Sequence, residues 1–152
     1  MELAHTILLD RWKTAGERVP KAPDGAAKAS ELEKKYDVSL PNDFRLYVTD
    51  CAPAEDIWDE TDLTWWMPSR IKNIPDEYEH AITNPQIADR AHTYLFFADY
   101  CVWFWAWAIC CDDGPDRGKV ALVTGRDDRV IAASFTEFVK AYVADPMSVS
   151  PS

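Results

Sequence analysis

The apolar run at residues 93–111 limits the fold of this chain more than any other stretch. It reads TYLFFADYCVWFWAWAICC. Its length fits either one membrane-spanning helix of about 20 residues or two strands joined by a tight turn. Asp99 lies within the run, where a carboxylate costs about 2.5 to 3.5 kcal/mol at mid-membrane depth, and the aromatic and β-branched residues favour strands. We therefore expect a hairpin that turns at Asp99 and Tyr100.

The second strand of this hairpin is apolar on both faces. Because side chains alternate along a strand, one face would carry Trp103, Trp105, Trp107 and Ile109, and the other Phe104, Ala106, Ala108 and Cys110. A strand that is apolar on both faces belongs in the middle of a sheet. We expect helices to approach closely over the small face at Ala106 and Ala108, and Trp105 to lie in the core with Phe138.

The remaining patterns predict an α+β fold in a single domain, as a mainly antiparallel meander sheet of about 4–6 strands. This sheet would pack against N-terminal helices and a C-terminal helix. Ser134 and Glu137 form a capping box before Phe135, Phe138, Val139 and Tyr142, which repeat at helical spacing. Helices are predicted at residues 2–16, 26–36, 42–48 and 134–145, and further strands at 63–67, 119–124 and 129–133.

The length of 152 residues fits one domain with one core. We expect the domain to span residues 1–145, with an N-terminal helix and loop at 1–25 and the main body at 26–145. Pro146 would end the last helix and leave residues 146–152 as a frayed tail. Residues 69–90 look irregular, apart from one helical turn near 76–82.

The composition limits the partner and the compartment. A net charge of −10 and a pI near 4.6 disfavour nucleic acid and anionic membranes as partners, and favour a basic one. The first fifteen residues lack a basic start followed by an apolar stretch, so a cytoplasmic location is expected. The four cysteines, Cys51, Cys101, Cys110 and Cys111, contain no C-x-x-C motif and are interpreted as reduced core residues.

No pattern of residues points to catalysis, and we expect no cofactor and no metal site. His5, His80 and His92 are scattered, and the sequence contains no P-loop, G-x-S-x-G or G-x-G-x-x-G motif. A nucleophile pair of Cys101 and His92 would lack an orienting third group. The acidic run 55–62 lacks the glycine and the distal glutamate of a calcium loop. A small cytosolic enzyme remains only as an alternative.

The same acidic run is the candidate partner-binding site, because it combines carboxylates with tryptophans. Tryptophans anchor protein interfaces, and carboxylates steer a basic partner. We expect the carboxylates to lie in solvent and Trp58 to be exposed, whereas Trp65 and Trp66 would point to opposite faces of a strand. The candidate residues are Glu55, Asp56, Trp58, Asp59, Glu60, Asp62 and Trp65.

Three landmarks in their order resemble the SUKH superfamily, which comprises Smi/Knr-type cell-wall-assembly regulators and bacterial toxin-immunity proteins. Residues 33–47 are similar to its helix, Leu-Pro, helix signature, with Leu40 and Pro41 at the centre. Residues 66–71 followed by 94–99 resemble its strand and Phe-rich hairpin, and residues 133–138 its closing Ser-Phe-x-x-Phe helix. The resemblance covers roughly residues 26–144.

This resemblance implies an α+β domain without catalytic residues, whose bacterial members bind and neutralise a cognate toxin, often a nuclease or deaminase. Together with the acidic charge, it predicts a non-catalytic immunity protein that binds a basic toxin as a monomer or weak homodimer. A regulatory or scaffold module of the same fold is the alternative.

Overall fold

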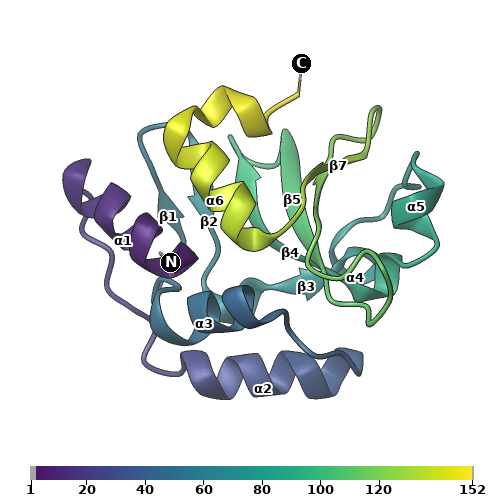
Figure 1. Cartoon of the computed structure of the whole chain (residues 1–152), viewed down its shortest axis with the longest axis horizontal. Helices are drawn as coiled ribbons and strands as arrows, with labels where there is room; N and C mark the ends of the chain where they lie inside the picture. Colours follow the sequence, from purple (N-terminus) through teal and green to yellow (C-terminus); the bar gives the residue numbers. More distant parts are fainter. Residues whose placement is uncertain (1–2, 152) are drawn as a thin grey trace.

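The apolar run forms the two central strands of one antiparallel sheet, β4 (Tyr94–Tyr100) and β5 (Trp105–Cys110). The computed structural model describes residues 3–151, and over this range the sheet has seven strands. Their order is β1-β2-β4-β5-β6-β7, and β3 pairs with β4 beside this path (Figure 1). The predicted hairpin and the α+β single-domain class are confirmed.

The other strands are short and antiparallel to their neighbours. The three predicted strands appear as β2 (Leu63–Trp65), β6 (Val120–Val123) and β7 (Arg129–Ala132). Two strands were not expected, β1 (Ile57–Trp58) and β3 (Lys72–Asn73). A strand of two residues is too short to show alternation, and these two form because their backbones pair with β2 and β4.

The predicted helices are present with small shifts of their ends. They are α1 (Ala4–Thr14), α2 (Gly25–Tyr36), α3 (Asn42–Asp50) and α6 (Phe135–Ala144). The predicted start of the first helix at Glu2 lies outside the described residues. The capping box is confirmed, because the Ser134 hydroxyl accepts a hydrogen bond from the Glu137 backbone N–H at 3.0 Å.

Residues 68–93 contain short helical segments rather than one turn near 76–82. These are η1 (Pro68–Arg70), α4 (Ile74–Glu77), α5 (Pro85–Ala88) and η2 (Ala91–Thr93). The side chains of Asn73 and Asn84 cap α4 and α5, and a proline follows near each cap. Because Asn73 caps it, α4 begins at Ile74, before the helical turn that was predicted near residues 76–82.

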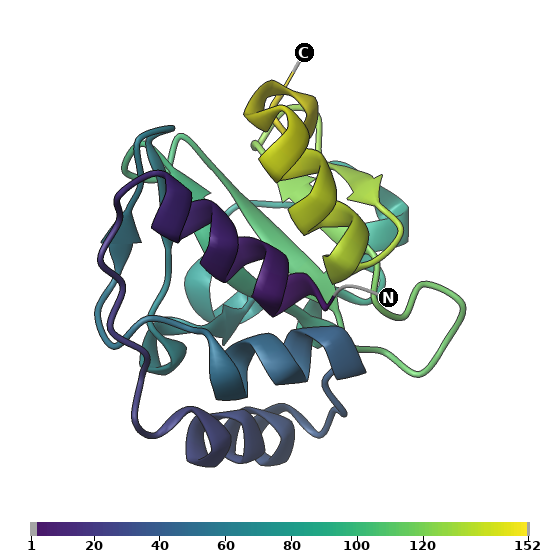
Figure 2. The same cartoon turned by 60° about the vertical axis from the view of Figure 1, so that its left-hand side comes forward.

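Three helices cover one side of the sheet. Figure 2 shows α1, α3 and α6 in front of the strands. The core on this side contains Trp65, Phe97, Trp107 and Ile109 from the sheet, and Phe138 from α6 packs on Trp107 with ring centroids 5.7 Å apart. The long helices α1, α3 and α6 therefore cover the tryptophan face of β5 rather than its alanine face, where only the short helices α4 and α5 lie.

The alanine face of β5 is covered by the segment between β3 and β4. Ala106 and Ala108 lie there beside Trp66 and Phe96, together with Ile74 and Ile87 of α4 and α5. Phe96 on β4 pairs directly with Ala108 on β5, so that a large side chain lies beside a small one. Large side chains on the neighbouring strands fill the space beside the two alanines, and the short helices α4 and α5 cover this face.

The turn of the central hairpin lies two residues later than predicted. Asp99 is a buried strand residue, and the turn is formed by residues 101–104, which include Trp103. Trp105 is half-buried rather than in the core, and its ring stacks on Tyr100 at 4.3 Å with an interplanar angle of 1°. Trp107 takes the core position that we expected for Trp105.

The chain end is ordered further than predicted. After α6, residues Pro146–Val149 form the helix η3, and Val149 is buried. The Val149 carbonyl accepts a hydrogen bond from the indole N–H of Trp107 at 2.8 Å. A buried indole N–H needs such an acceptor, so this contact holds the segment that we expected to fray. Among residues 3–151, no helix is long and apolar enough to cross a membrane.

Candidate protein-binding site

The acidic run 55–62 forms the β1–β2 hairpin, and its central carboxylate points inward. Asp59 is only 3% exposed. It accepts hydrogen bonds from the hydroxyl of Tyr142, from the indole N–H of Trp65 at 3.3 Å and from the backbone N–H of Thr61 at 2.8 Å. The expectation that Asp59 lies in solvent is wrong, because it supplies the acceptor for donors that the core would otherwise leave unsatisfied.

Burial raises the pKa of the Tyr142 hydroxyl above its usual range, and the hydrogen bond to Asp59 raises it further. Tyr142 therefore remains a donor to Asp59 at neutral pH. Trp65 is fully buried as well, between α1 and α6 and the sheet, and Trp66 is fully buried on the opposite side. Trp65 therefore lies out of reach of a partner, which corrects its assignment as a contact residue.

Two of the remaining carboxylates of the run form ion pairs within the chain. Asp56 accepts a hydrogen bond from the Met67 backbone N–H at 2.8 Å and pairs with Arg70. Glu60 pairs with Arg11. Among the described residues, Glu55 has no such partner. The charges of Asp56 and Glu60 are therefore balanced internally, whereas that of Glu55 is not.

Asp62 and Trp58 connect this hairpin to the turn of the central one. Trp58 is 49% exposed, as expected, and its indole N–H donates to the Asp62 carboxylate at 2.9 Å. The backbone carbonyl of Asp62 accepts from the Cys101 N–H at 2.9 Å. The acidic hairpin and the β4–β5 turn therefore lie side by side at one end of the sheet.

The β4–β5 turn has an unusual backbone. Cys101, Val102 and Trp103 have φ angles of +44°, +55° and +66°. L-residues other than glycine avoid this left-handed region at a cost of about 1–2 kcal/mol each, and a β-branched residue such as Val102 is least suited to it. Three such residues in succession persist only where the surrounding structure holds them.

Several hydrogen bonds hold this turn in place. The buried carboxylate of Asp99 accepts from the Trp103 backbone N–H at 2.7 Å and from the Trp66 indole at 2.6 Å. The Trp103 indole donates to Glu77 at 3.0 Å. The Phe104 backbone N–H donates to the Tyr100 carbonyl at 2.8 Å. The turn is thus fixed from the sheet, from α4 and from the acidic hairpin.

The turn presents apolar side chains to solvent. Val102 is 74% exposed and Phe104 is 67% exposed. The ring of Phe104 lies 6.5 Å from that of Tyr100, and Tyr100 lines a shallow hollow together with the exposed Met147. We call this set the tip surface; it comprises Trp58, Asp62, Tyr100, Val102, Phe104 and Met147. Clustered exposed apolar groups of this kind mark interaction sites.

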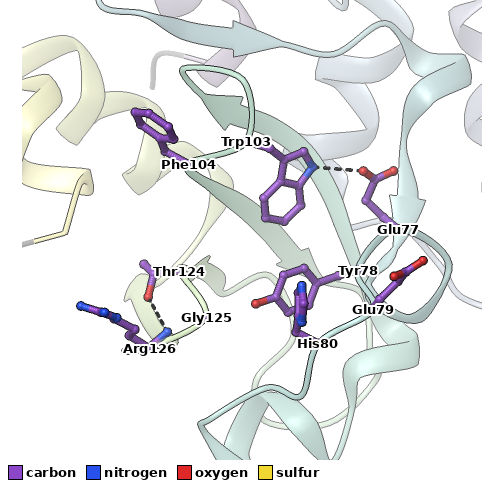
Figure 3. A pocket seen from close by; sticks show the side chains of 9 residues that line it. All are labelled: Glu77, Tyr78, Glu79, His80, Trp103, Phe104, Thr124, Gly125 and Arg126. Carbon is purple, nitrogen blue, oxygen red and sulfur yellow. Dashed lines mark hydrogen bonds between the residues drawn. The ribbon is translucent and has the colours of Figure 1, made fainter.

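A larger hollow lies on the other side of the turn. Its volume is about 580 Å³, and it is lined by residues 77–80, by Trp103 and Phe104, and by residues 124–126 (Figure 3). The rings of Tyr78 and Trp103 are 5.4 Å apart and nearly parallel, and His80 meets Tyr78 edge-on at 5.3 Å. We call this the aromatic hollow.

The structure does not bring Cys101 and His92 together as a nucleophile pair. His92 precedes β4 and Cys101 follows it, so the seven residues of the strand separate them by roughly 20 Å. Burial raises the pKa of Cys51 to about 12 and raises that of Cys110 as well, which disfavours their thiolates. Within residues 3–151, no three His, Cys, Asp or Glu side chains are grouped to hold a metal ion.

Of the tip surface, the sequence singled out Trp58 and Asp62 as candidates but not Val102 and Phe104. The signals for Val102 and Phe104 were misleading, because both lie in the apolar run and looked like strand residues. Their exposure follows from where the turn forms, and this is fixed by Asp99, Asp62 and Glu77 from three separate segments.

Comparison with known proteins agrees with this fold. Curated proteins give no significant match to the chain. The model of the SMI1/KNR4 family (SUKH-1) matches residues 26–141, from α2 to within α6. This range contains the whole sheet, the acidic hairpin and the β4–β5 turn. The match covers well over half of the sequence, and the chain therefore belongs to the SMI1/KNR4 family (SUKH-1).

Proposed function

We propose that this protein is a non-catalytic immunity protein that neutralises a cognate bacterial toxin, of nuclease or deaminase type, by binding it directly. It acts as a monomer or weak homodimer in the cytoplasm of the cell that makes the toxin. Family membership supports a role in immunity or regulation. The net charge of −10 supports a basic partner, since nucleases that act on nucleic acid carry basic surfaces.

The observation that carries the proposal is the tip surface. It holds two large apolar side chains, Val102 and Phe104, in solvent on a backbone that is strained at three successive residues. Neither exposure nor strain contributes to folding, and strained segments of this kind occur at ligand-binding positions. Because the turn is already fixed, binding it costs little conformational entropy.

We assign distinct roles to the residues around the tip surface. Val102, Phe104 and Trp58 are the anchors, because buried apolar and aromatic side chains carry most of the energy of an interface. Asp62 and Glu55 steer the basic partner toward them. Asp56 and Glu60, which pair with Arg70 and Arg11, lie at the edge of this surface and add less to the steering. Asp59 and Trp65 support the hairpin from the core.

The test uses the toxin encoded beside the gene for this protein, co-expressed with it in a sensitive cell. The double variant Val102→Ser with Phe104→Ser should fold like the wild type and fail to protect the cell. The matched control is Leu3→Ser with Leu9→Ser, which removes two exposed apolar residues, 46% and 40% exposed, from α1. The control should protect fully.

Three outcomes contradict the proposal. Full protection by the folded double variant at the tip would exclude the tip surface as the binding site. Protection that requires a turnover activity of this protein would favour the enzyme alternative. Binding only to a host protein, with no effect on any toxin, would favour the regulatory module.

A further inference from the structure

We propose that the aromatic hollow beside the turn binds an arginine side chain of the partner protein. The partner's identity rests on the proposed function, whereas the arginine site itself can be tested without a toxin. The inference starts from the aromatic pair Tyr78 and Trp103, whose ring planes differ by only 9°. The two rings stack on each other, so a planar cation can extend the stack on an outer face of the pair.

The platform is held rigidly. Trp103 donates its indole N–H to Glu77 at 3.0 Å, and its ring packs edge-on against Phe96 at 5.2 Å. Phe96 is completely buried in the sheet. Gly125 faces the platform closely, since a Cβ at this position would lie 3.0 Å from the Tyr78 hydroxyl. The aromatic wall is therefore fixed before any ligand arrives.

The charges around the platform favour a cation. Figure 3 shows the carboxylates of Glu77 and Glu79 on one side of the aromatic rings and Arg126 on the opposite side, with its guanidinium directed away from them. In the part of the chain that the structure describes, neither glutamate forms an ion pair. One oxygen of Glu77 accepts from Trp103, and the other oxygen is available to a ligand.

The protein uses the same combination of groups for one of its own arginines. The guanidinium of Arg70 lies over the ring of Trp66, 4.0 Å from its centroid. It pairs with Asp56 and lies 3.9 Å from the carboxylate of Asp99. An aromatic face beside two carboxylates thus holds a guanidinium on this fold. The aromatic hollow has the same three components, and its own arginine, Arg126, is directed away from them (Figure 3).

Arginine fits the hollow better than other ligands. Its guanidinium is planar, stacks on aromatic rings and donates two parallel hydrogen bonds to a carboxylate, whereas a lysine ammonium is a strongly hydrated point charge. An anion in the hollow would be repelled by the carboxylates of Glu77 and Glu79 and attracted only by Arg126. The hollow also adjoins Phe104 of the tip surface, so one partner can occupy both.

The test is an NMR titration of the whole protein with N-acetyl-arginine-N-methylamide. The matched ligand is the citrulline derivative, which has nearly the same shape but no charge. We expect saturable shifts at the Trp103 indole N–H and the Gly125 amide with arginine, at least fivefold weaker binding with lysine, and no saturation with citrulline. The variant Glu79→Gln should weaken arginine binding about tenfold, and Glu31→Gln, at an exposed position of α2, should have no effect.

The variant Glu77→Gln separates charge from structure, because glutamine keeps an oxygen acceptor for the Trp103 indole. It should leave the indole resonance of the free protein near its place and still weaken arginine binding. Equal binding of arginine and citrulline, or shifts confined to the acidic hairpin, would overturn the inference. So would arginine binding that is unchanged when both glutamates are replaced.

A second readout separates this inference from the proposed function. Replacing both Glu77 and Glu79 with glutamine should lower the affinity for the cognate toxin at least tenfold. Unchanged toxin affinity in this variant, with protection lost in the Val102 and Phe104 variant, would overturn the inference alone. A protein that binds arginine in the hollow but protects against no toxin would overturn the proposed function alone.

Discussion

Two neighbouring loops at one end of the sheet differ in how they use their residues. The acidic hairpin, residues 55–62, is conspicuous in sequence, yet Asp59 accepts hydrogen bonds from the core, and Glu60 and Asp56 pair with Arg11 and Arg70. The β4–β5 turn, residues 101–104, looks like part of a strand, yet it exposes Val102 and Phe104. In the acidic hairpin, most of the carboxylates hold the structure together. In the β4–β5 turn, exposed apolar side chains form the main part of the candidate surface.

The difference between the two loops predicts that a change at Asp59 lowers the stability of the fold most. Asp59→Ala leaves the buried donors of Trp65, Tyr142 and Thr61 without their acceptor, so the free energy of unfolding should fall by about 3 kcal/mol. The matched control is Glu55→Ala in the same hairpin, which should change it by less than about 0.5 kcal/mol. Urea unfolding of both variants measures the difference, and equal stability would mean that the hairpin is only a solvated face.

A smaller effect is expected at Asp99, which joins the turn to the sheet. Asp99→Asn keeps one oxygen acceptor but loses the charge and one of the two hydrogen bonds, from Trp66 and Trp103. The free energy of unfolding should fall by about 2 kcal/mol. Amide hydrogen exchange at residues 101–104 should also accelerate more than in β6. Uniform acceleration across the sheet would show that Asp99 does not hold the turn specifically.

Most of the fold was predictable because its signals are local. The capping box at Ser134, the proline after Leu40 and the repeat of Phe135, Phe138 and Tyr142 each depend on residues within two turns of one helix. The apolar run likewise gave the central strands without information from elsewhere. The sequence misled us on which face of β5 the helices cover, since both faces are apolar and the choice depends on residues in other strands.

The candidate site was harder to predict because its signals are not local. Asp59 is buried by contacts with Tyr142, which lies far along the chain in α6. The position of the β4–β5 turn depends on Asp62 and Glu77 as well as on Asp99. Trp58 was the exception, since four of the other five residues at positions 55–60 are carboxylates and only Ile57 is apolar.

The third prediction tests whether the strained backbone at Val102 lowers the stability of the fold while its side chain strengthens partner binding. Val102→Asn places a residue that tolerates left-handed φ at a position where φ is +55°. The free energy of unfolding should rise by about 1 kcal/mol, while binding of the partner weakens. Val102→Ile retains the β-branch and should produce neither change. A destabilised Val102→Asn variant would show that the backbone there is not strained.

The last prediction concerns the thiols and distinguishes the turn from the core. Cys101 lies in the turn and is half-exposed, whereas Cys51, Cys110 and Cys111 are buried. At pH 8 a water-soluble disulfide reagent should label Cys101 in the native protein and all four cysteines after unfolding. Burial raises the pKa of Cys51 to about 12, so its thiol stays protonated and unreactive at this pH.

The same burial fixes the direction of the alkaline transition. A thiol of the unfolded chain ionises near pH 9, while Cys51 in the folded chain holds its proton to about pH 12. The folded state therefore binds more protons between these values, and its stability is fully present below pH 9 and is lost as the pH rises toward 12. Cys51→Ala should flatten this decline in a series of urea unfolding curves, whereas Cys101→Ala should not. A decline of equal slope in both variants would assign it to the other groups whose pKa values are raised by burial, which are Cys110, Cys111, Tyr47 and Tyr94.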